Sequence, residues 1–325
     1  MNIVMLGHSN AGKTTYMAAL YHLMQEEIFG YSMDVDIEET CAQNRFGHPR
    51  RKLRTNNYRK YNPNYTWEDA EQEEEDLTES GKNLTKGIYP PSTAIRQRYF
   101  FHFYYDGEDV CNFSWFDYRG GALMERVSQS SDLEEIGDEL AQSNALLVFV
   151  DGTQLERFNE DDQRYLRRLT YFVKDAFSKI NQPHDARYPV SVVITKKDLC
   201  HDVEKSEGMK YLKQNLFTDI ENSKSIVGLL TYTTINAKKI KNVQWPLLFS
   251  LRHNICTLKS ETQQAYQYRE NKRGLFGSIR ESLFHKDQHY YYGTLYELEE
   301  NEPRLTDILS KNSGADNFIY IGRNK

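Results

Sequence analysis

Residues 2–14 read NIVMLGHSNAGKT, and this stretch decides the fold. Its largely apolar beginning, Asn2–Leu6, predicts a short buried strand. From Lys13 to about Ile28, apolar residues recur at helical spacing, which predicts a helix. Between the two, residues 7–14 match the pattern GxxxxGK[ST]. The order of strand, glycine-containing loop and helix is the context that this pattern requires.

The chemistry of this loop suits the phosphates of a nucleotide. Glycines let the backbone curl so that its N–H groups point at phosphate oxygens, and the helix N-terminus adds partial positive charge. In this interpretation Lys13 bridges the β- and γ-phosphates as a catalytic residue, and the Thr14 hydroxyl is a ligand of Mg²⁺. His8 is at a variable position, and we give it no acid–base role. The predicted nucleotide-binding residues of the loop are Gly7, Asn10, Ala11, Gly12, Lys13, Thr14 and Thr15.

A second motif follows the predicted strand Val110–Phe116 and reads Asp117-Tyr118-Arg119-Gly120. An aspartate at the end of a buried strand near the loop can hold Mg²⁺ through water. The N–H of Gly120 can bond the γ-phosphate, because glycine has no side chain to block the approach. The pattern DxxG also occurs by chance, and its position after a strand favours the functional interpretation. We therefore predict Asp117 as a metal residue and Gly120 as a catalytic one.

A third motif, Thr195-Lys196-Lys197-Asp198, ends the predicted strand Pro189–Thr195. The Asp198 carboxylate can accept two hydrogen bonds from guanine, whereas adenine lacks that donor pair and would leave the carboxylate unpaired. The stem of Lys196 can cover the base, and the Thr195 hydroxyl can hold neighbouring loops together. Ligands of open α/β sheets bind at the carboxyl edge of the strands, where all three motifs are expected. The loop after the next strand is expected to support the base through its backbone and adds Asn236, Ala237 and Lys238.

Strands that alternate with helices predict an α/β fold with a mostly parallel sheet. The strands Tyr99–Tyr105 and Val110–Phe116, joined by Asp106-Gly107, predict one antiparallel hairpin. The remaining predicted elements are helix 123–143, strand 145–150, helix 161–180, strand 189–195, helix 209–222, strand 226–235 and a long helix from 246.

Two segments do not follow the pattern. Residues 31–86 are polar, and the tail after about residue 270 is rich in tyrosine. We expect one domain at 1–270, with a polar insert at 31–86 before its second strand, and a C-terminal extension at 271–325.

The insert carries two blocks of like charge. Six of the eleven residues in Arg50–Lys60 are basic, and eight of the twelve in Glu68–Glu79 are acidic. We expect the basic block to be an irregular loop and the acidic block a solvated helix. A site for single-stranded nucleic acid or acidic lipid is the alternative for the basic block, and we favour a solvated loop that pairs loosely with the acidic helix.

The composition narrows the class of protein further. The 325 residues carry a formal net charge of −6, and the mean hydropathy is −0.74. The sequence contains no run of 18 apolar residues, so we expect no transmembrane helix. The beginning of the sequence is unlike a signal peptide. The four cysteines are scattered without a CxxC pair. We expect a cytoplasmic protein for which nucleic acid is not a partner.

Taken together, these motifs resemble the GTPases of the TRAFAC class of Ras-like P-loop proteins. The chain is most similar to bacterial double-GTPase-type proteins, which share a loop of the form GHSNAGKT, a long polar insert and a Pro-Pro-x-Thr segment, here residues 90–93. The resemblance covers about residues 1–258. It implies a three-layer P-loop NTPase sandwich, GTP or GDP with Mg²⁺, and a molecular switch with a protein effector. It also implies that Thr93 is the switch threonine that reaches Mg²⁺ and the γ-phosphate, with Ser92 as the alternative.

Two departures from the class predict slow hydrolysis. Where Ras-like enzymes have a glutamine after DxxG to orient the attacking water, this chain has Gly121, and the position two before Thr93 is Pro91 rather than arginine. We expect hydrolysis to depend on a partner protein or a second copy of the chain. Arg119 is a weaker candidate for stabilising transition-state charge. A nucleotide-state sensor or scaffold without turnover is the alternative function, and Asp198 argues against a third, a P-loop ATPase or kinase.

Overall fold

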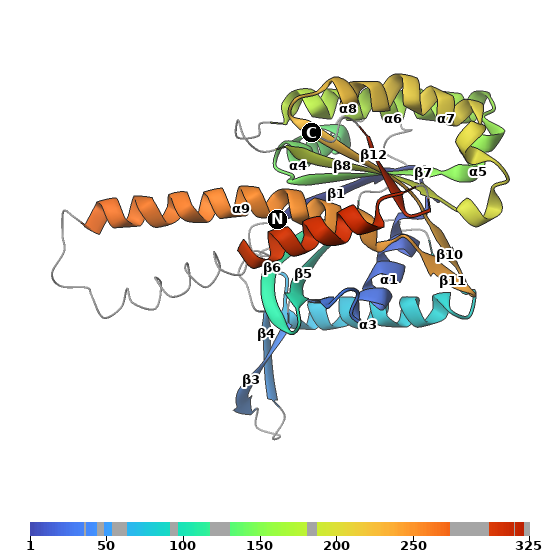
Figure 1. The fold of residues 1–325 in the computed structure, drawn as a ribbon. Helices are drawn as coiled ribbons and strands as arrows, with labels where there is room; N and C mark the ends of the chain where they lie inside the picture. Colours follow the sequence, from blue (N-terminus) through green and yellow to red (C-terminus); the bar gives the residue numbers. More distant parts are fainter. Residues whose placement is uncertain are drawn as a thin grey trace.

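The computed structural model describes residues 1–35, 37–43, 49–53, 64–91, 97–117, 131–180, 187–273, 299–314 and 316–321. In this part of the chain, an eight-stranded sheet with the order β12-β9-β8-β7-β1-β6-β5-β2 has helices on both faces (Figure 1). The strands of the sheet are β1 (Asn2–Gly7), β2 (Tyr31–Val35), β5 (Gln97–Tyr105), β6 (Glu108–Asp117), β7 (Ala145–Asp151), β8 (Tyr188–Thr195), β9 (Ile226–Tyr232) and β12 (Phe318–Ile321).

The centre of the sheet is parallel, and its margins are antiparallel. The strands β6, β1, β7, β8 and β9 pair in parallel, whereas β5 pairs antiparallel with β6. Asp106 and Gly107 connect β5 and β6 with φ angles of 47° and 82°, as a tight hairpin turn requires. The predicted mostly parallel sheet with an antiparallel hairpin is confirmed.

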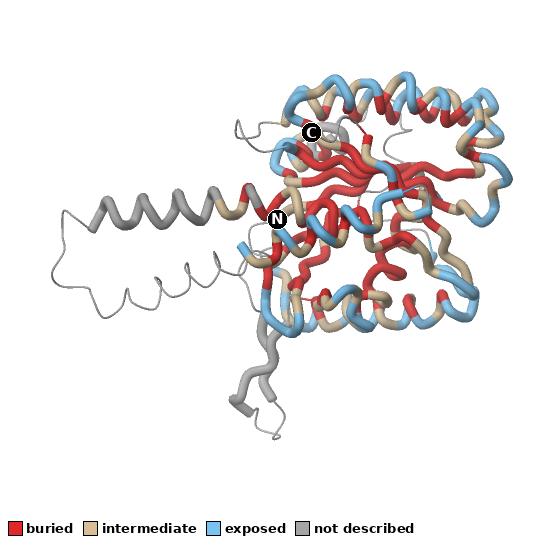
Figure 2. Tube along the Cα trace, viewed as in Figure 1, coloured by how far each residue is buried: buried red, intermediate tan, exposed pale blue. Residues whose placement is uncertain are grey.

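Two hydrophobic cores lie on opposite faces of this sheet. Along β1, Ile3 and Met5 enter one core, and Val4 and Leu6 enter the other. Figure 2 shows the central strands buried between the helical layers. The first layer holds α1 (Lys13–Met24), α3 (Trp67–Leu84) and α9 (Gln244–Arg273), and the second holds α4 (Ser131–Ala141), α6 (Glu160–Lys179), α7 (Glu207–Leu212) and α8 (Thr218–Asn222).

Smaller elements complete the described chain. A short helix, α5 (Gly152–Arg157), follows β7, and two ribbons stand apart from the main sheet. The ribbons are β3 (Ile37–Gln43) with β4 (Pro49–Leu53), and β10 (Thr234–Asn236) with β11 (Lys239–Lys241). Single turns of 3-10 helix cover Lys197–Leu199 and Val203–Lys205, and a π-helical turn covers Lys213–Phe217 between α7 and α8.

The polar segment 31–86 is more ordered than its composition predicts. Its first strand, β2, joins the sheet beside β5 and buries Tyr31, Met33 and Val35. The prediction of an irregular loop for the basic block is wrong at residues 50–53, which form part of β4. The acidic block does form a helix, α3, whose N-terminus is closed by a capping box between Thr66 and Asp69.

The tail also contributes to the body of the protein. Helical residues 299–312 place Leu305 and Leu309 in the core of the first layer. After them, β12 pairs antiparallel with β9 and extends the sheet. The Thr231 hydroxyl donates to the carbonyl of Asn317 at 2.8 Å and fixes the approach to β12. The described part of the tail is therefore packed on the sheet.

Candidate functional site

The loop between β1 and α1 is held in a curled conformation by local backbone geometry. Asn10 and Gly12 have φ angles of 67° and 84°, in the left-handed region. The N–H of Tyr16 donates to the carbonyl of Gly12 at 2.8 Å, at the start of α1. A Cβ atom on Gly7 would lie 2.7 Å from the carbonyl oxygen of Phe149, so only glycine fits there. The curled conformation of the loop before α1 therefore depends on Gly7, Asn10 and Gly12, which all belong to the motif.

Lys13 folds back over this loop. Its side chain is 7% exposed, and Nζ lies 3.2 Å from the carbonyl oxygen of Gly7 and 3.4 Å from that of His8. Burial lowers the pKa of Lys13 from its ordinary value, and the nearby Asp117 carboxylate partly offsets this effect. The ammonium is therefore at the mouth of the curled loop, where an anion bound by the loop would meet it.

Asp117 lies next to the same loop because β6 and β1 are paired. Its Cα is the register partner of Met5, and its side chain is 1% exposed. The Thr14 hydroxyl donates to Asp117 Oδ2 at 3.2 Å, and Lys13 Nζ lies 4.0 Å from Oδ1. The structure thus brings together three residues that the sequence predicted from two separate motifs.

The donor atoms at this point suit Mg²⁺, which prefers hydroxyl, carboxylate and water oxygens. Thr14 and Asp117 supply a hydroxyl and a carboxylate in contact with each other. Among the described residues, no group of three histidine, cysteine, aspartate or glutamate side chains could hold a metal ion by itself. A Mg²⁺ ion at this place would need further oxygens from water, a phosphate or residues outside the described chain.

The third motif meets the loop at the carboxyl end of β8. The buried Thr195 hydroxyl donates to the carbonyl of Ala11 at 2.9 Å, as expected for a residue that holds neighbouring loops together. Lys196 has a φ angle of 56°, and its Nζ lies 2.5 Å from Oδ2 of Asp151. Asp198 is exposed and accepts a hydrogen bond from Asn236 Nδ2 at 2.9 Å.

The loop between β10 and β11 brings Asn236 to Asp198. Asn236 Oδ1 accepts from the N–H groups of Lys238 and Lys239 at 3.0 and 3.1 Å, which fixes the turn. Ala237 and Lys238 are exposed at its tip. The amide of Lys238 is thus engaged within the turn, and the Asn236 side chain is the group of this loop that reaches the third motif.

Two residues of the site escaped the sequence analysis. Asp151 ends β7, pairs with Lys196 and accepts from the N–H of Thr153 at 2.9 Å at the start of α5. Its position directly after the apolar run 145–150 repeats the pattern of Asp117 and was a usable signal. Tyr165 of α6 accepts a hydrogen bond from the N–H of His8 at 2.8 Å. That contact spans 157 residues and has no local signature in the sequence.

Several predicted residues lie outside the described residues. They are Ser92, Thr93, Arg119, Gly120 and Gly121. The described chain before Thr93 contacts β10, because the Tyr89 hydroxyl donates to the carbonyl of Ile235 at 3.4 Å.

The comparisons with known proteins add little to this geometry. No protein-family model and no curated protein matches the chain. A solved structure that is similar to it is the signal recognition particle receptor SRb-GTP/SRX complex from Chaetomium thermophilum, at 14% identity and a TM-score of 0.33. The similarity covers 73% of this chain and 90% of the other, and it is too low to support an argument about function. Among the described residues, the helices are too short or too polar to cross a membrane.

Proposed function

We propose that the chain is a Ras-like P-loop GTPase, closest to the double-GTPase type, and acts as a switch that binds GTP or GDP with Mg²⁺ and hydrolyses GTP slowly. The contact between Thr14 and Asp117 beside Lys13 carries this proposal. It joins the hydroxyl and ammonium of one motif to the carboxylate of another. A nucleoside triphosphate and its metal ion require these groups close together, beside the phosphates.

A second contact supports a single nucleotide shared by the loop and the third motif. Thr195 donates to Ala11, so the strand end that leads to Asp198 is fixed to the loop that would hold the phosphates. In our proposal guanine replaces Asn236 as the donor to Asp198, or shares the carboxylate with it. The exposed Asp198 carboxylate can accept from both donors of the guanine edge.

Mg²⁺ in this proposal is held by the Thr14 hydroxyl, by Asp117 through water, and by Thr93. When bound, it neutralises charge on the β- and γ-phosphates. Gly120 contributes its backbone N–H to the γ-phosphate. Because Gly121 offers no side chain to orient water, we propose that a protein partner or a second copy of the chain completes the catalytic site in the cytoplasm.

Nucleotide binding by the full chain tests the base assignment. We expect GTP and GDP to bind in the presence of Mg²⁺ and ATP to compete at least about tenfold less well, because adenine cannot pair with Asp198. Asp198→Asn should weaken GTP binding about tenfold or more, and Asp202→Asn, an exposed carboxylate in the next turn, should leave it unchanged. Equal competition by ATP in the wild-type protein contradicts the assignment.

Single-turnover hydrolysis separates the switch from its alternative, a sensor or scaffold without turnover. The observation that favours the alternative is Gly121 in place of a glutamine. We expect a slow rate that rises with protein concentration or with added cell extract. A rate that stays at the uncatalysed background under both conditions supports the sensor and removes the hydrolytic part of the proposal.

A further inference from the structure

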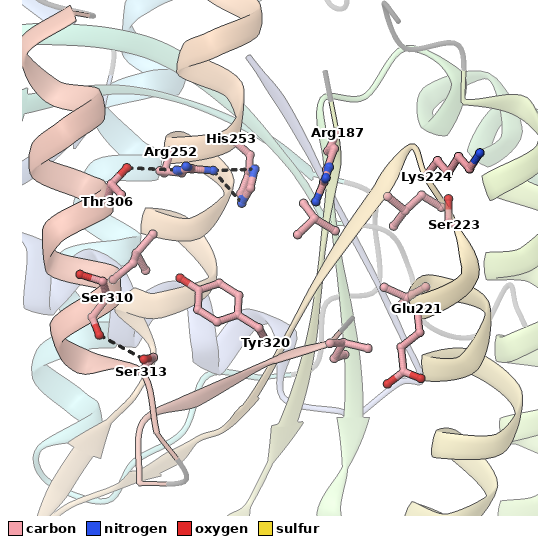
Figure 3. Close-up of a pocket in the computed structure, with 15 residues that line it drawn as sticks. Arg187, Glu221, Ser223, Lys224, Arg252, His253, Thr306, Ser310, Ser313 and Tyr320 are labelled. Atoms are coloured by element: carbon pink, nitrogen blue, oxygen red, sulfur yellow. Dashed lines mark hydrogen bonds between the residues drawn. The ribbon is translucent and has the colours of Figure 1, made fainter. Parts of the chain in front are cut away.

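A cavity of about 750 Å³ lies far from the candidate nucleotide site. It is open between α8 and β9 on one side and α9 and the helical residues 299–312 on the other (Figure 3). Arg187, which lines it, precedes β8, whereas Thr195 ends the same strand. At about 3.3 Å per residue, the eight residues of β8 separate the two places by roughly 25 Å. The cavity therefore belongs to the opposite edge of the sheet.

The lining of this cavity is basic. Among the described residues, Arg187, Lys224 and Arg252 face it together with one carboxylate, Glu221, and these four side chains leave a net charge of +2. Figure 3 shows the Glu221 carboxylate well apart from the Arg252 guanidinium, toward the other end of the cavity. None of the three cations forms an ion pair with a carboxylate of the described residues.

Carboxylates nearby on the flanking helices are paired with other lysines. Asp219 of α8 lies 2.8 Å from Lys174, and Asp307 lies 2.6 Å from Lys311. These two carboxylates therefore do not neutralise the cations of the cavity.

Neutral groups orient one of the cations. Arg252 Nε donates to the Thr306 hydroxyl at 3.2 Å, and Nη1 lies 3.3 Å from Nδ1 of His253. Arginine can only donate, so the imidazole nitrogen accepts. Burial, followed by the charges of Arg252 and Arg187, lowers the pKa of His253 to about 3, so the ring is neutral near pH 7. Arg252 is thus held in place without losing its charge.

The other walls suit an organic molecule. Ser310, Ser313 and Tyr320 bring hydroxyl groups, and the side chains of Ile226 and Leu309 bring apolar surface. The volume is in the range of sites that enclose small ligands, which are mostly apolar with a few polar groups at fixed positions. An oriented guanidinium beside further cations is the arrangement that recognises a phosphate group, which accepts two parallel hydrogen bonds from arginine.

We propose that this cavity is a binding site for a small organic phosphate. The phosphate group binds to Arg252, Arg187 and Lys224, and the organic part packs against the apolar wall. A dianion matches the net charge of +2 better than a carboxylate does. The site is independent of the nucleotide proposed above, because it lies at the amino end of β8.

Calorimetric titration of the full chain with phenyl phosphate tests the proposal. We expect a dissociation constant below about 1 mM, the same in the wild type and in Lys13→Ala, in which the candidate nucleotide loop is weakened. Lys224→Gln and Arg187→Gln change exposed side chains that the fold does not need, and each should weaken binding at least fivefold. Lys213→Gln, an exposed lysine in the π-helical turn before α8 that does not line the cavity, is the matched control and should change nothing.

Other ligands and a spectroscopic signal make the result decisive. Benzoate and benzyl alcohol should bind at least tenfold more weakly than phenyl phosphate. In histidine ring spectra, His253 should shift on titration, and His8, beside the nucleotide loop, should not. The proposal is overturned by absent binding, by loss of binding in Lys13→Ala, by equal binding of benzoate or benzyl alcohol, by unaffected lining variants, or by a shift at His8 alone.

Discussion

The Thr195 hydroxyl donates to the carbonyl of Ala11 at 2.9 Å, and this hydrogen bond joins two motifs that lie 184 residues apart. Thr195 is 3% exposed, and its hydroxyl also lies 3.4 Å from the carbonyl of Val150 on β7. One side chain thus ties the curled loop to two parallel strands. The proposed nucleotide would depend on this contact at both its base and its phosphates.

Replacing Thr195 with valine tests that dependence. Valine keeps the shape but leaves the Ala11 carbonyl without its donor, which costs about 1–3 kcal/mol when the group is buried. We expect GTP affinity to fall about fivefold to tenfold, measured by equilibrium binding with Mg²⁺. Thr195→Ser keeps the hydroxyl and is the control. A serine variant that is as weak as the valine variant would mean that the lost methyl group, not the hydroxyl, matters.

Lys13→Ala should remove most of the nucleotide affinity. The ammonium is buried at the mouth of the loop, and its contact with a phosphate is a charge-assisted interaction in a poorly solvated place. We expect GTP affinity to fall by at least about a hundredfold, while circular dichroism and the melting temperature change little. Lys86→Ala, an exposed lysine after α3, is the control. Tight Mg²⁺-dependent GTP binding by the Lys13 variant contradicts the role of the loop.

The parallel centre of the sheet could be predicted because its strands are continuous apolar runs. Residues 145–150 form such a run and are followed by Asp151. Residues 189–195 are apolar except for Ser191 and the final Thr195, and Asp151 and Thr195 mark the carboxyl edge. The same logic predicts the positions of Asp117 and Thr195 from the sequence alone. It should also have located Asp151, which ends β7 in the same manner.

The margins of the sheet were harder to predict. β2 and β12 have only five and four residues. In β2, half-buried Ser32 and Asp34 stand between buried residues, whereas β12 is apolar throughout but too short to stand out in the sequence. In β2 every second residue is buried: Tyr31, Met33 and Val35 alternate with Ser32 and Asp34. The average polarity of the segment 31–86 conceals this period of two. Strand β12 is positioned by contacts with β9, nearly ninety residues earlier in the chain, such as Thr231 with Asn317. No local pattern encodes such a partner.

Glu73 of α3 should make stability depend on pH. Burial is the main cause that raises the pKa of Glu73 to about 8, against 4.5 in its ordinary state, and Asp69 and Asp76 add to the effect. The folded state therefore holds this proton more tightly than the unfolded state. Its contribution to the free energy of unfolding falls as the pH rises from about 4.5 to about 8.

Glu73→Gln removes the titration and keeps an oxygen for the Tyr65 hydroxyl, which donates to Glu73 Oε2 at 2.5 Å. We expect the variant to be more stable than the wild type by about 1–2 kcal/mol at pH 8 and close to it at pH 5. Urea unfolding at both pH values measures this difference. An equal change at the two pH values would assign the effect to packing instead of protonation.

Phe318→Ala tests whether the tail is part of the folded body. Phe318 is 1% exposed on β12, its ring lies 5.2 Å from that of Trp245 in α9, and it belongs to the core of the first layer. Removing a buried phenyl ring costs about 3–5 kcal/mol. We expect a loss of that size in chemical unfolding, in one cooperative transition. Ile319→Ala changes the next residue, which is 44% exposed on the other face of the strand, and should cost less than about 1 kcal/mol. Similar small effects of both variants would mean that β12 detaches freely from β9, and that the tail adds nothing to the stability of the sheet.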